Sequence, residues 1–441
     1  YGPKNYYDVN FGWQSTLGKK LKLDFDTQYS LNDHTTYEDI TEAFDVGTFI
    51  ETNTYGLERN WNFISRLDFE YPINDSLGAE FGIKYNNLLQ DSYLEMSTIV
   101  DNTPTDSGFI SQFSYDQTVA AAYVSVEKTW PKWGAKLGLR AEQTNTLAQM
   151  PLDAYDFKNN YFSLFPTGYV NYKLSKSATL YYNFGRRISR PLMHMVNPFI
   201  YYSDRYLVEQ GTPNLRPEFV YINELGLSRY AKRLGFDANV SYRYVVDKNR
   251  RYLRQEEELS IISYKNILQG HVVGVSLSGR YKPVTPLTIR FTTDFWAVRI
   301  QDSDITNGEV VITPGIRSNL DFYLSLGKGW RFQFRNYYSP KYQLQQGYMF
   351  PKYVMSLGVS KGFFKNQLRI RLNVSDVTNT LRSYFRTNES QVDYYFLGNW
   401  DWETRVVYVG LNWDFGTEYK GKQKRRGKSD ESGGSSVPGG L

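Results

Sequence analysis

A period-two alternation of apolar and polar residues recurs from one end of the chain to the other. In residues 234–244 the even positions are apolar or aromatic, and the odd positions are polar or glycine. The same alternation appears in the runs 21–29, 330–335, 368–375 and 407–415. Successive side chains of a β-strand point to opposite faces, so each run predicts a strand with one apolar and one polar face. The chain is therefore predicted to be all-β.

The length of these runs favours a membrane protein over a soluble sandwich. The runs span roughly 10 to 14 residues, whereas a typical soluble strand has about 5 to 6. About nine to eleven tilted residues cross a bilayer. The mean hydropathy is only −0.53, with 17% aromatic residues, which fits alternating strands because half of each strand is polar. No apolar run approaches the roughly 18 residues of a transmembrane helix, and the absence of cysteine excludes disulfides. We expect a transmembrane antiparallel β-barrel.

The connections between the runs alternate between short and long. Short turns are predicted near 18–20, 73–75, 131–132, 175–177, 232–233, 283–286, 327–329 and 361–366. Longer loops are predicted near 31–53, 95–110, 147–160, 191–217, 248–257, 301–311, 340–348 and 380–401. Outer-membrane barrels keep short turns in the periplasm and long loops outside. Lys132 and Lys328 should therefore be periplasmic, and Asp39 and Glu257 extracellular.

The strand count predicts an unfilled seam. We count roughly 17 strands in the chain, and the first and last both run from the loop side to the turn side. Two strands of equal direction cannot pair antiparallel. Single-chain bacterial barrels are antiparallel throughout and have an even number of strands, so these two strands cannot close such a barrel. We therefore expect an odd number of further strands upstream of Tyr1, and about five would complete a 22-stranded, plugged barrel. Residues 1–415 form the predicted barrel portion, whereas the basic, then Ser/Gly-rich residues 416–441 are predicted to be a disordered periplasmic tail.

The stretch from Ala178 to Tyr230 combines two strand-like runs with a long, proline-rich loop. In the first run Leu180, Tyr182 and Phe184 share one parity, and Arg187 lies on the opposite, polar parity. Proline cannot donate to a strand ladder, so the loop should stay out of the sheet. Its motif residues are Arg187, Arg190, Pro191, Asn197, Pro198, Phe199, Gly211, Pro213, Asn214, Leu215, Pro217 and Glu218.

These motif residues resemble the barrel region of TonB-dependent receptors, and most of all the outer-membrane β-barrel family of Bacteroidota. Two further stretches resemble that family. One is a late strand that ends in Asn373, Asp376 and Asn379. The other looks like the aromatic-ended last strand that the barrel assembly machinery reads, with Val407, Val409, Leu411, Trp413 and Phe415.

The resemblance implies energised uptake of a scarce nutrient, such as a metal chelate, an oligosaccharide or a peptide. It implies as partners the lipid of a Gram-negative outer membrane, a plug domain, the TonB energy-coupling protein, and a surface lipoprotein or other envelope subunits. We recognise no plug or TonB box in the sequence. The alternative is a receptor-like barrel that serves as a structural subunit of an outer-membrane assembly or secretion complex; a diffusion porin ranks third.

Chemistry other than transport finds little support in the sequence. No catalytic, cofactor or nucleic-acid motif is visible, and His34, His194 and His271 lack metal-ligand spacing. Arg187 and Arg190 should hold the proline-rich loop by charge-assisted hydrogen bonds. Arg187 could instead form an ion pair with loop carboxylates, hold a plug or bind an anionic ligand. The inward parity carries both signs, in Lys22, Asp24, Asp26, Asp237, Arg243, Arg290, Asp294, Arg331, Arg335, Arg369, Arg371 and Asp414. Such a lining suits a plugged lumen as well as an open channel.

Overall fold

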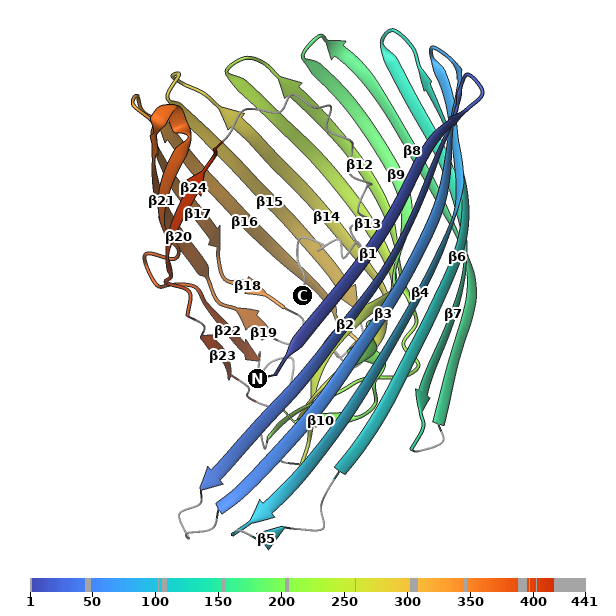
Figure 1. The fold of residues 1–441 in the computed structure, drawn as a ribbon, viewed down its shortest axis with the longest axis vertical. Coiled ribbons are helices and arrows are strands. Elements are labelled where there is room, and N and C mark those ends of the chain that lie inside the picture. The colour runs from blue at the N-terminus through green and yellow to red at the C-terminus, as the bar shows by residue number, and fades with distance from the viewer. Residues whose placement is uncertain are drawn as a thin grey trace.

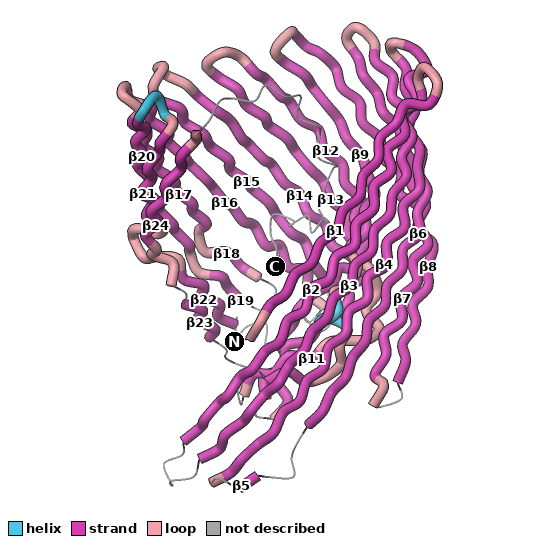
Figure 2. The backbone as a smooth tube through the Cα atoms, in the orientation of Figure 1, coloured by secondary structure: helices cyan, strands magenta, loops and turns pink. Residues whose placement is uncertain are grey.

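Antiparallel strands make up almost all of the described chain (Figures 1 and 2). The computed structural model describes residues 2–43, 49–101, 103–104, 109–152, 155–202, 206–257, 259–301, 308–344, 347–387, 395, 397–401 and 403–415. The predicted tail, 416–441, lies outside these residues. The described helices are the single turns α1 (Met193–Val196) and η1 (Phe364–Asn366). No helix in the described part is long and apolar enough to cross a membrane.

Seventeen described strands of at least seven residues follow one another in a single curved sheet, which confirms the strand count from the sequence. The first nine are β1 (Lys4–Leu17), β2 (Leu21–Ala43), β3 (Phe49–Asn74), β4 (Leu77–Val100), β6 (Phe109–Thr129), β7 (Trp133–Met150), β8 (Tyr155–Ser175), β9 (Ala178–Ser189) and β12 (Glu218–Tyr230). The others are β13 (Leu234–Glu256), β14 (Leu259–Tyr281), β15 (Leu287–Gln301), β16 (Val310–Ser325), β17 (Trp330–Ser339), β20 (Lys352–Phe363), β21 (Leu368–Val374) and β24 (Val407–Trp413).

The remaining strands are short. Three of them, β5 (Thr103–Pro104), β10 (Ile200–Tyr202) and β11 (Leu207–Gln210), attach to the curved sheet. The others form a separate four-stranded sheet of β18 (Tyr342–Gln343), β19 (Gly347–Met349), β22 (Arg382–Thr387) and β23 (Leu397–Asp401). Described residues of two predicted long loops, 340–348 and 380–401, thus belong to this small sheet.

The strands β2, β3 and β4 are much longer than predicted, with 23, 26 and 24 residues. The expected loop at 31–53 is mostly strand, because threonines and tyrosines continue the alternation beyond the apolar part. Tyr37 lies opposite Tyr55 in register, with ring centroids 5.3 Å apart. Aromatic and β-branched residues favour strands and stabilise them through such cross-strand pairs. The wall therefore extends beyond the roughly nine to eleven residues that cross a bilayer.

The register confirms the predicted division of faces. On β13, Val240 lies opposite the apolar Leu225 and Val275, and 54% of its side chain is exposed on the outer face. Its neighbour Asn239 lies opposite Gly226 and Ser276 on the inner face. Side chains on neighbouring strands share a face at directly opposed positions, so one apolar and one polar surface run across the sheet.

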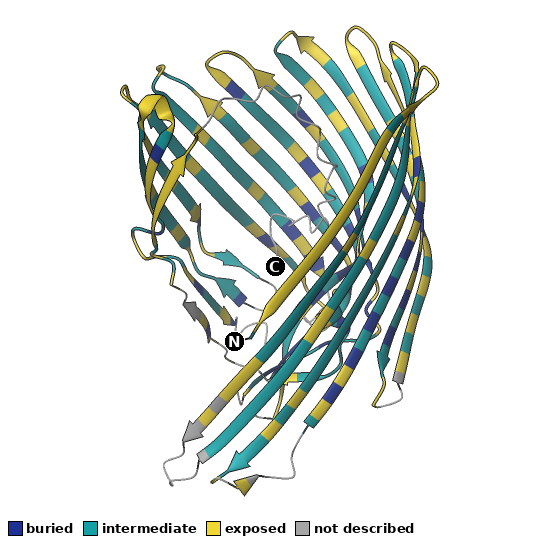
Figure 3. Cartoon of the chain, in the orientation of Figure 1, coloured by how far each residue is buried: buried dark blue, intermediate teal, exposed yellow. Residues whose placement is uncertain are grey.

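The two end strands do not pair with each other. Within the described residues β1 pairs with β2, and β24 pairs with β21. Both strands are exposed along nearly their whole length and border a gap in the wall (Figure 3). This confirms that the first and last strands are not partners, as their equal direction requires. The additional strands that would fill the seam stay a prediction.

Candidate functional site

The long loop between β9 and β12 folds back against the inner face of the sheet. Odd positions of β6 face inward, and those from Ser111 to Ala121 are buried. Two of these residues are Phe113 and Tyr115. They form a cluster with Val196 and Leu215 of the loop and Tyr264 of β14. Burying these apolar side chains against the wall fixes the loop inside the barrel outline rather than outside it.

The middle of the loop covers a free edge of β14. β15 pairs with β14 only from Gly270 onward, which leaves the edge of residues 260–262 open. β11 occupies this edge as a parallel partner, with the fully buried Val208 opposite Ile261. The Tyr264 hydroxyl donates to Oε1 of Glu209 at 2.7 Å. An exposed edge would present unpaired backbone groups, so the loop completes the hydrogen bonding of this wall.

The Asn-Pro and Gly-x-Pro motif residues close the loop on itself. The N–H of Gly211 donates to the carbonyl of Asn197 at 2.8 Å. A Cβ on Gly211 would lie 2.4 Å from that carbonyl oxygen, so no side chain fits there. Oδ1 of Asn197 accepts from the N–H of Phe199 at 3.1 Å, and the Pro198 carbonyl accepts from Nε2 of Gln210 at 3.0 Å. These motif residues therefore have a structural role, because they hold the two ends of the loop segment together.

The other prolines of the motif pack on the wall and leave no ligand cavity. Pro191, Pro213 and Pro217 face the inner sides of β6, β7 and β8 across a space of only ≈ 20 Å³. About one water fills such a volume. Asn214 is exposed at the loop surface. This part of the loop is therefore packing rather than a binding site.

Arg190 anchors the base of the loop, but to the barrel wall and not to a loop carboxylate. Its guanidinium lies 2.5 Å from Oε2 of Glu142 and donates to the Thr144 hydroxyl at 3.0 Å. Arg140 binds the other oxygen of Glu142 at 2.6 Å. Glu142 lies 48 positions away on β7, so the charge-assisted contact of Arg190 joins the loop to a distant strand of the wall. Arg187 points inward, is exposed, and makes no ion pair within the described residues.

Glu218, the last residue of the motif, also binds to the barrel wall. It is buried, and its carboxylate accepts from the N–H of Asn249 on β13 at 3.3 Å. Nearby, Arg216 forms an ion pair with Asp247 at 2.6 Å. The end of the loop is thereby attached to the neighbouring strand.

The inner face of β2, β3, β4 and β7 at the short-turn end carries a group of charges that we call the acidic wall. Its carboxylates are Asp24, Asp26, Asp68, Glu70 and Glu80, and its cations are Lys22, Arg66 and Lys136. The pairs are Lys22–Glu70 at 2.9 Å, Arg66–Asp68 at 3.1 Å, Arg66–Asp26 at 3.4 Å and Lys136–Glu80 at 2.7 Å. The fifth carboxylate, Asp24, accepts from the Gln14 side chain at 2.9 Å. Four of the five carboxylates of the acidic wall are therefore paired with the wall's own three cations.

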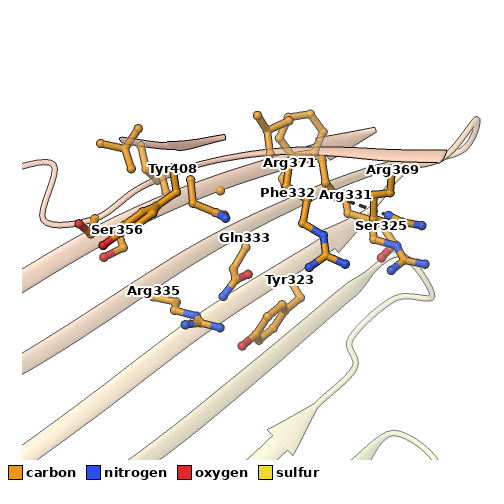
Figure 4. Close-up of a pocket in the computed structure, with 17 residues that line it drawn as sticks. Tyr323, Ser325, Arg331, Phe332, Gln333, Arg335, Ser356, Arg369, Arg371 and Tyr408 are labelled. Carbon is orange, nitrogen blue, oxygen red and sulfur yellow. Dashed lines mark hydrogen bonds between the residues drawn. The ribbon is translucent and has the colours of Figure 1, made fainter. Parts of the chain in front are cut away.

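A second group of charges, which we call the basic wall, consists of Arg331 and Arg335 on β17 and Arg369 and Arg371 on β21. The strand between them, β20, places Ser360 opposite both Arg331 and Arg371, so all these side chains share the inner face. Together they line a hollow of ≈ 540 Å³ (Figure 4). Its polar lining is completed by Tyr323, Ser325, Gln333, Ser356, Ser360, Asn373, Ser375 and Tyr408, and no carboxylate lines it.

The guanidinium groups of the basic wall have no ion-pair partner in the described part of the chain. Arg369 is the most buried, with 7% exposed, and it donates to Oδ1 of Asn366 at 3.0 Å and to Oγ of Ser360 at 3.5 Å. Two carboxylates stand at the border. Asp321, opposite Arg335 in register, accepts from the Tyr323 hydroxyl at 3.1 Å, and Asp414 accepts from Asn412 at 3.1 Å. The sequence placed these arginines inward but did not show that they converge.

The late motif of Asn373, Asp376 and Asn379 forms a hydrogen-bonded turn just beyond β21. Asp376 is 1% exposed, and its carboxylate accepts from the Thr404 hydroxyl at 2.6 Å and from the N–H groups of Thr380 and Leu381 at 3.1 and 3.0 Å. Burial alone would raise the pKa of Asp376, but these hydrogen bonds outweigh it and hold the pKa below its ordinary value. The residues of this motif join β21 to the segment that leads into β24.

The last strand shows the outward alternation that was expected. Val407, Val409, Leu411, Trp413 and Phe415 are all exposed on the outer face, where a bilayer would cover them.

The three histidines do not come together, and no cluster of potential metal ligands occurs in the part of the chain that the structure describes.

Comparisons with known proteins agree with this architecture. The family model described as outer membrane protein beta-barrel family matches residues 15–413. No curated protein sequence matches the chain.

The solved structures that share the fold include three iron-uptake proteins. The ferric citrate transporter FecA in its unliganded form has a TM-score of 0.67 and 13% identity, over 92% of this chain and 61% of that chain. The ferric yersiniabactin uptake receptor FyuA from Yersinia pestis has a TM-score of 0.57 and 10% identity, over 93% and 60%. The FrpB iron transporter from Neisseria meningitidis has a TM-score of 0.57 and 13% identity, over 94% and 73%.

The chain thus spans about three fifths of the length of the first two structures, and identities this low show the fold alone. Membership of the Bacteroidota type stays a prediction. The family match over most of the chain, the long antiparallel strands and the apolar outer face lead to one conclusion. The chain belongs to the outer membrane beta-barrel family, with the fold of TonB-dependent receptors, and is a multi-pass β-barrel protein of the outer membrane.

Proposed function

We propose that this barrel takes part in TonB-energised uptake of a scarce nutrient across the outer membrane. The observation that carries the proposal is the inner face, which bears charges of both signs from β2 to β21. Charged side chains line a barrel interior only where water or polar protein fills it. A lumen of this kind suits a barrel that holds a polar plug and admits a polar solute.

The similar structures support the same class of function. By their names, FecA transports ferric citrate, FyuA takes up ferric yersiniabactin, and FrpB transports iron. For this protein we propose a nutrient of comparable type, a metal chelate, an oligosaccharide or a peptide. A plug domain and the TonB protein would be its partners in that process.

Uptake in matched strains tests the proposal. Cells with the gene intact or disrupted, each with and without functional TonB, are given a labelled ferric chelate, maltodextrin or oligopeptide. We expect uptake of one of these probes to fall to background when either the gene or TonB is lost. Unchanged uptake of all three, together with stable co-purification of the protein with other envelope proteins, would favour the structural-subunit alternative.

A further inference from the structure

We propose that the basic wall binds a solute that carries two or more oxyanion groups, carboxylate or phosphate. This inference rests on the proposed uptake function and narrows its substrate class to multivalent anions. The site is the hollow between β17, β20 and β21, next to the last strand, β24.

The strand register brings the cationic groups together. Arg331 and Arg371 both lie opposite Ser360, one on each side of β20, and Arg335 lies opposite Ser356. Arg369 follows on the same face of β21 and is held by Asn366 and Ser360. A guanidinium offers five N–H donors in a planar fork that matches carboxylate and phosphate oxygens. Several such forks around one hollow of ≈ 540 Å³ suit a ligand with several anionic groups.

The charge balance indicates that a counter-charge must come from outside the wall. In the acidic wall, four of the five carboxylates form ion pairs of 2.7 to 3.4 Å with three cations, and Arg66 is shared by two of them. In the basic wall, no ion pair involves the four arginines among the described residues, and no carboxylate lines the hollow. Like charges that face one hollow repel each other, and water in the open lumen reduces this repulsion without removing it. A bound anion would remove that repulsion.

The surroundings favour a solute over a segment of the described chain. The 190–217 loop covers the inner face of β6, β7 and β8, whereas no described segment covers the basic wall. Arg331, Arg335 and Arg371 remain exposed towards the lumen, and only Arg369 is buried. Hydroxyl groups of Ser325, Ser356 and Tyr408 add neutral donors around the hollow. The site is therefore open, cationic and rich in donors.

Calorimetric titration of the full-length protein in detergent tests this site. The probes are inorganic pyrophosphate and tricarballylate, with sodium chloride at matched ionic strength and glycerol as controls. We expect saturable binding of both multivalent anions and of neither control. The double variant Arg331→Gln/Arg371→Gln should bind them at least about tenfold more weakly, because each charge-assisted hydrogen bond to the anion contributes on the order of one factor of ten.

Two further variants keep the result interpretable. Lys22→Gln removes an inward cation that is already paired in the acidic wall, and we expect it to leave anion binding unchanged. Arg371→Lys keeps the charge but removes the planar fork, so it should weaken binding even if the double variant does not fold. Absence of saturable binding by the wild-type protein, or equal binding by wild type and Arg371→Lys, would overturn the inference.

Binding in detergent requires no energy coupling, so the two proposals can fail separately. Saturable anion binding without TonB-dependent uptake would contradict the uptake function alone. TonB-dependent uptake of a probe by a protein that binds no multivalent anion would contradict this site alone.

Discussion

The acidic and basic walls lie at the same end of the barrel but balance charge in opposite ways. Lys22 and Arg331 both follow short turns, at 18–20 and 327–329. On the acidic wall Lys22 meets Glu70 at 2.9 Å across two neighbouring strands. On the basic wall Arg331 lies opposite Ser360 on the neighbouring strand β20, and Arg371 lies opposite the other side of Ser360, on β21. In the acidic wall, neighbouring strands thus supply paired counter-charges. In the basic wall they supply mainly serines and further arginines, and the one carboxylate in register, Asp321 opposite Arg335, accepts from the Tyr323 hydroxyl instead of forming an ion pair.

This difference separates structural charges from charges that are available to a ligand. A charge that is already paired is costly to remove, because its partner is left without compensation. Removing a charge that has no partner should change the free energy of unfolding only slightly. The four predictions below use stability to test this distinction, from the largest expected effect to the smallest.

The comparison requires that both walls face the lumen, and β13 tests that division of faces. Val240→Lys places a charge on the outer face and should cost about 2–4 kcal/mol if it lies near the bilayer midplane. Asn239→Lys, one residue earlier and inward, should change stability only slightly. Urea unfolding in lipid vesicles measures both variants. Equal losses at the two positions would mean that the faces are wrongly assigned.

Within the acidic wall, Arg66 is the residue whose removal should cost most. Its side chain is 14% exposed and pairs with both Asp26 and Asp68. Arg66→Met should lower the free energy of unfolding by about 1–3 kcal/mol, since two partly buried carboxylates lose their cation. Arg66→Lys should recover part of that loss. A stability equal to wild type for Arg66→Met would show that the ion pairs of this wall do not stabilise the fold.

Asp376 shows a third way to hold a charge, through hydrogen bonds rather than cations. Its lowered pKa means that it stabilises the fold above the ordinary carboxyl pKa of about 3.9, and that this stability is lost as the pH falls through the lower, folded-state pKa. Asp376→Asn should cost about 1–2 kcal/mol at neutral pH. The variant should also lose part of the acid dependence of unfolding. An unchanged acid profile would show that the carboxylate is not ionised in the folded protein.

Removing a cation from the basic wall should not lower the free energy of unfolding as it does in the acidic wall. Arg371→Gln, without added anion and at low salt, should change the free energy of unfolding by less than about 1 kcal/mol or raise it slightly, because it relieves repulsion. Salt should stabilise wild type more than the variant, since screening weakens repulsion. A loss as large as that of Arg66→Met would indicate that Arg371 has a counter-charge inside the protein.

Local patterns predicted much of this fold. The alternation at 234–244 predicted which side chains face outward, and the short turns at 18–20 and 327–329 fall where Gly and Lys interrupt it. The strand lengths were underestimated because Tyr37 and Tyr55 stabilise pairing beyond the apolar segment, where no membrane pattern marks the strand.

The candidate site was less accessible to prediction, because it depends on register between distant segments. The ion pair of Arg190 with Glu142 joins the base of the loop to β7, and the sequence indicated only that Arg190 would hold the loop, without its partner. Likewise, the alternation placed Arg331 and Arg371 on the inner parity but did not show that Ser360 lies between them. Two closely spaced arginines on each of two strand-like runs were the available signal.

The most direct test of the central claim is the side of the membrane on which the short turns lie. The protein has no cysteine, so single substitutions can be labelled without background. Lys328→Cys lies in the turn beside the basic wall, and Glu257→Cys lies at the opposite end, between β13 and β14. With an impermeant maleimide on intact cells, we expect labelling at position 257 and none at 328 until the outer membrane is permeabilised. Labelling at 328 but not at 257 in intact cells would contradict the orientation and place both charged walls at the outer mouth of the barrel.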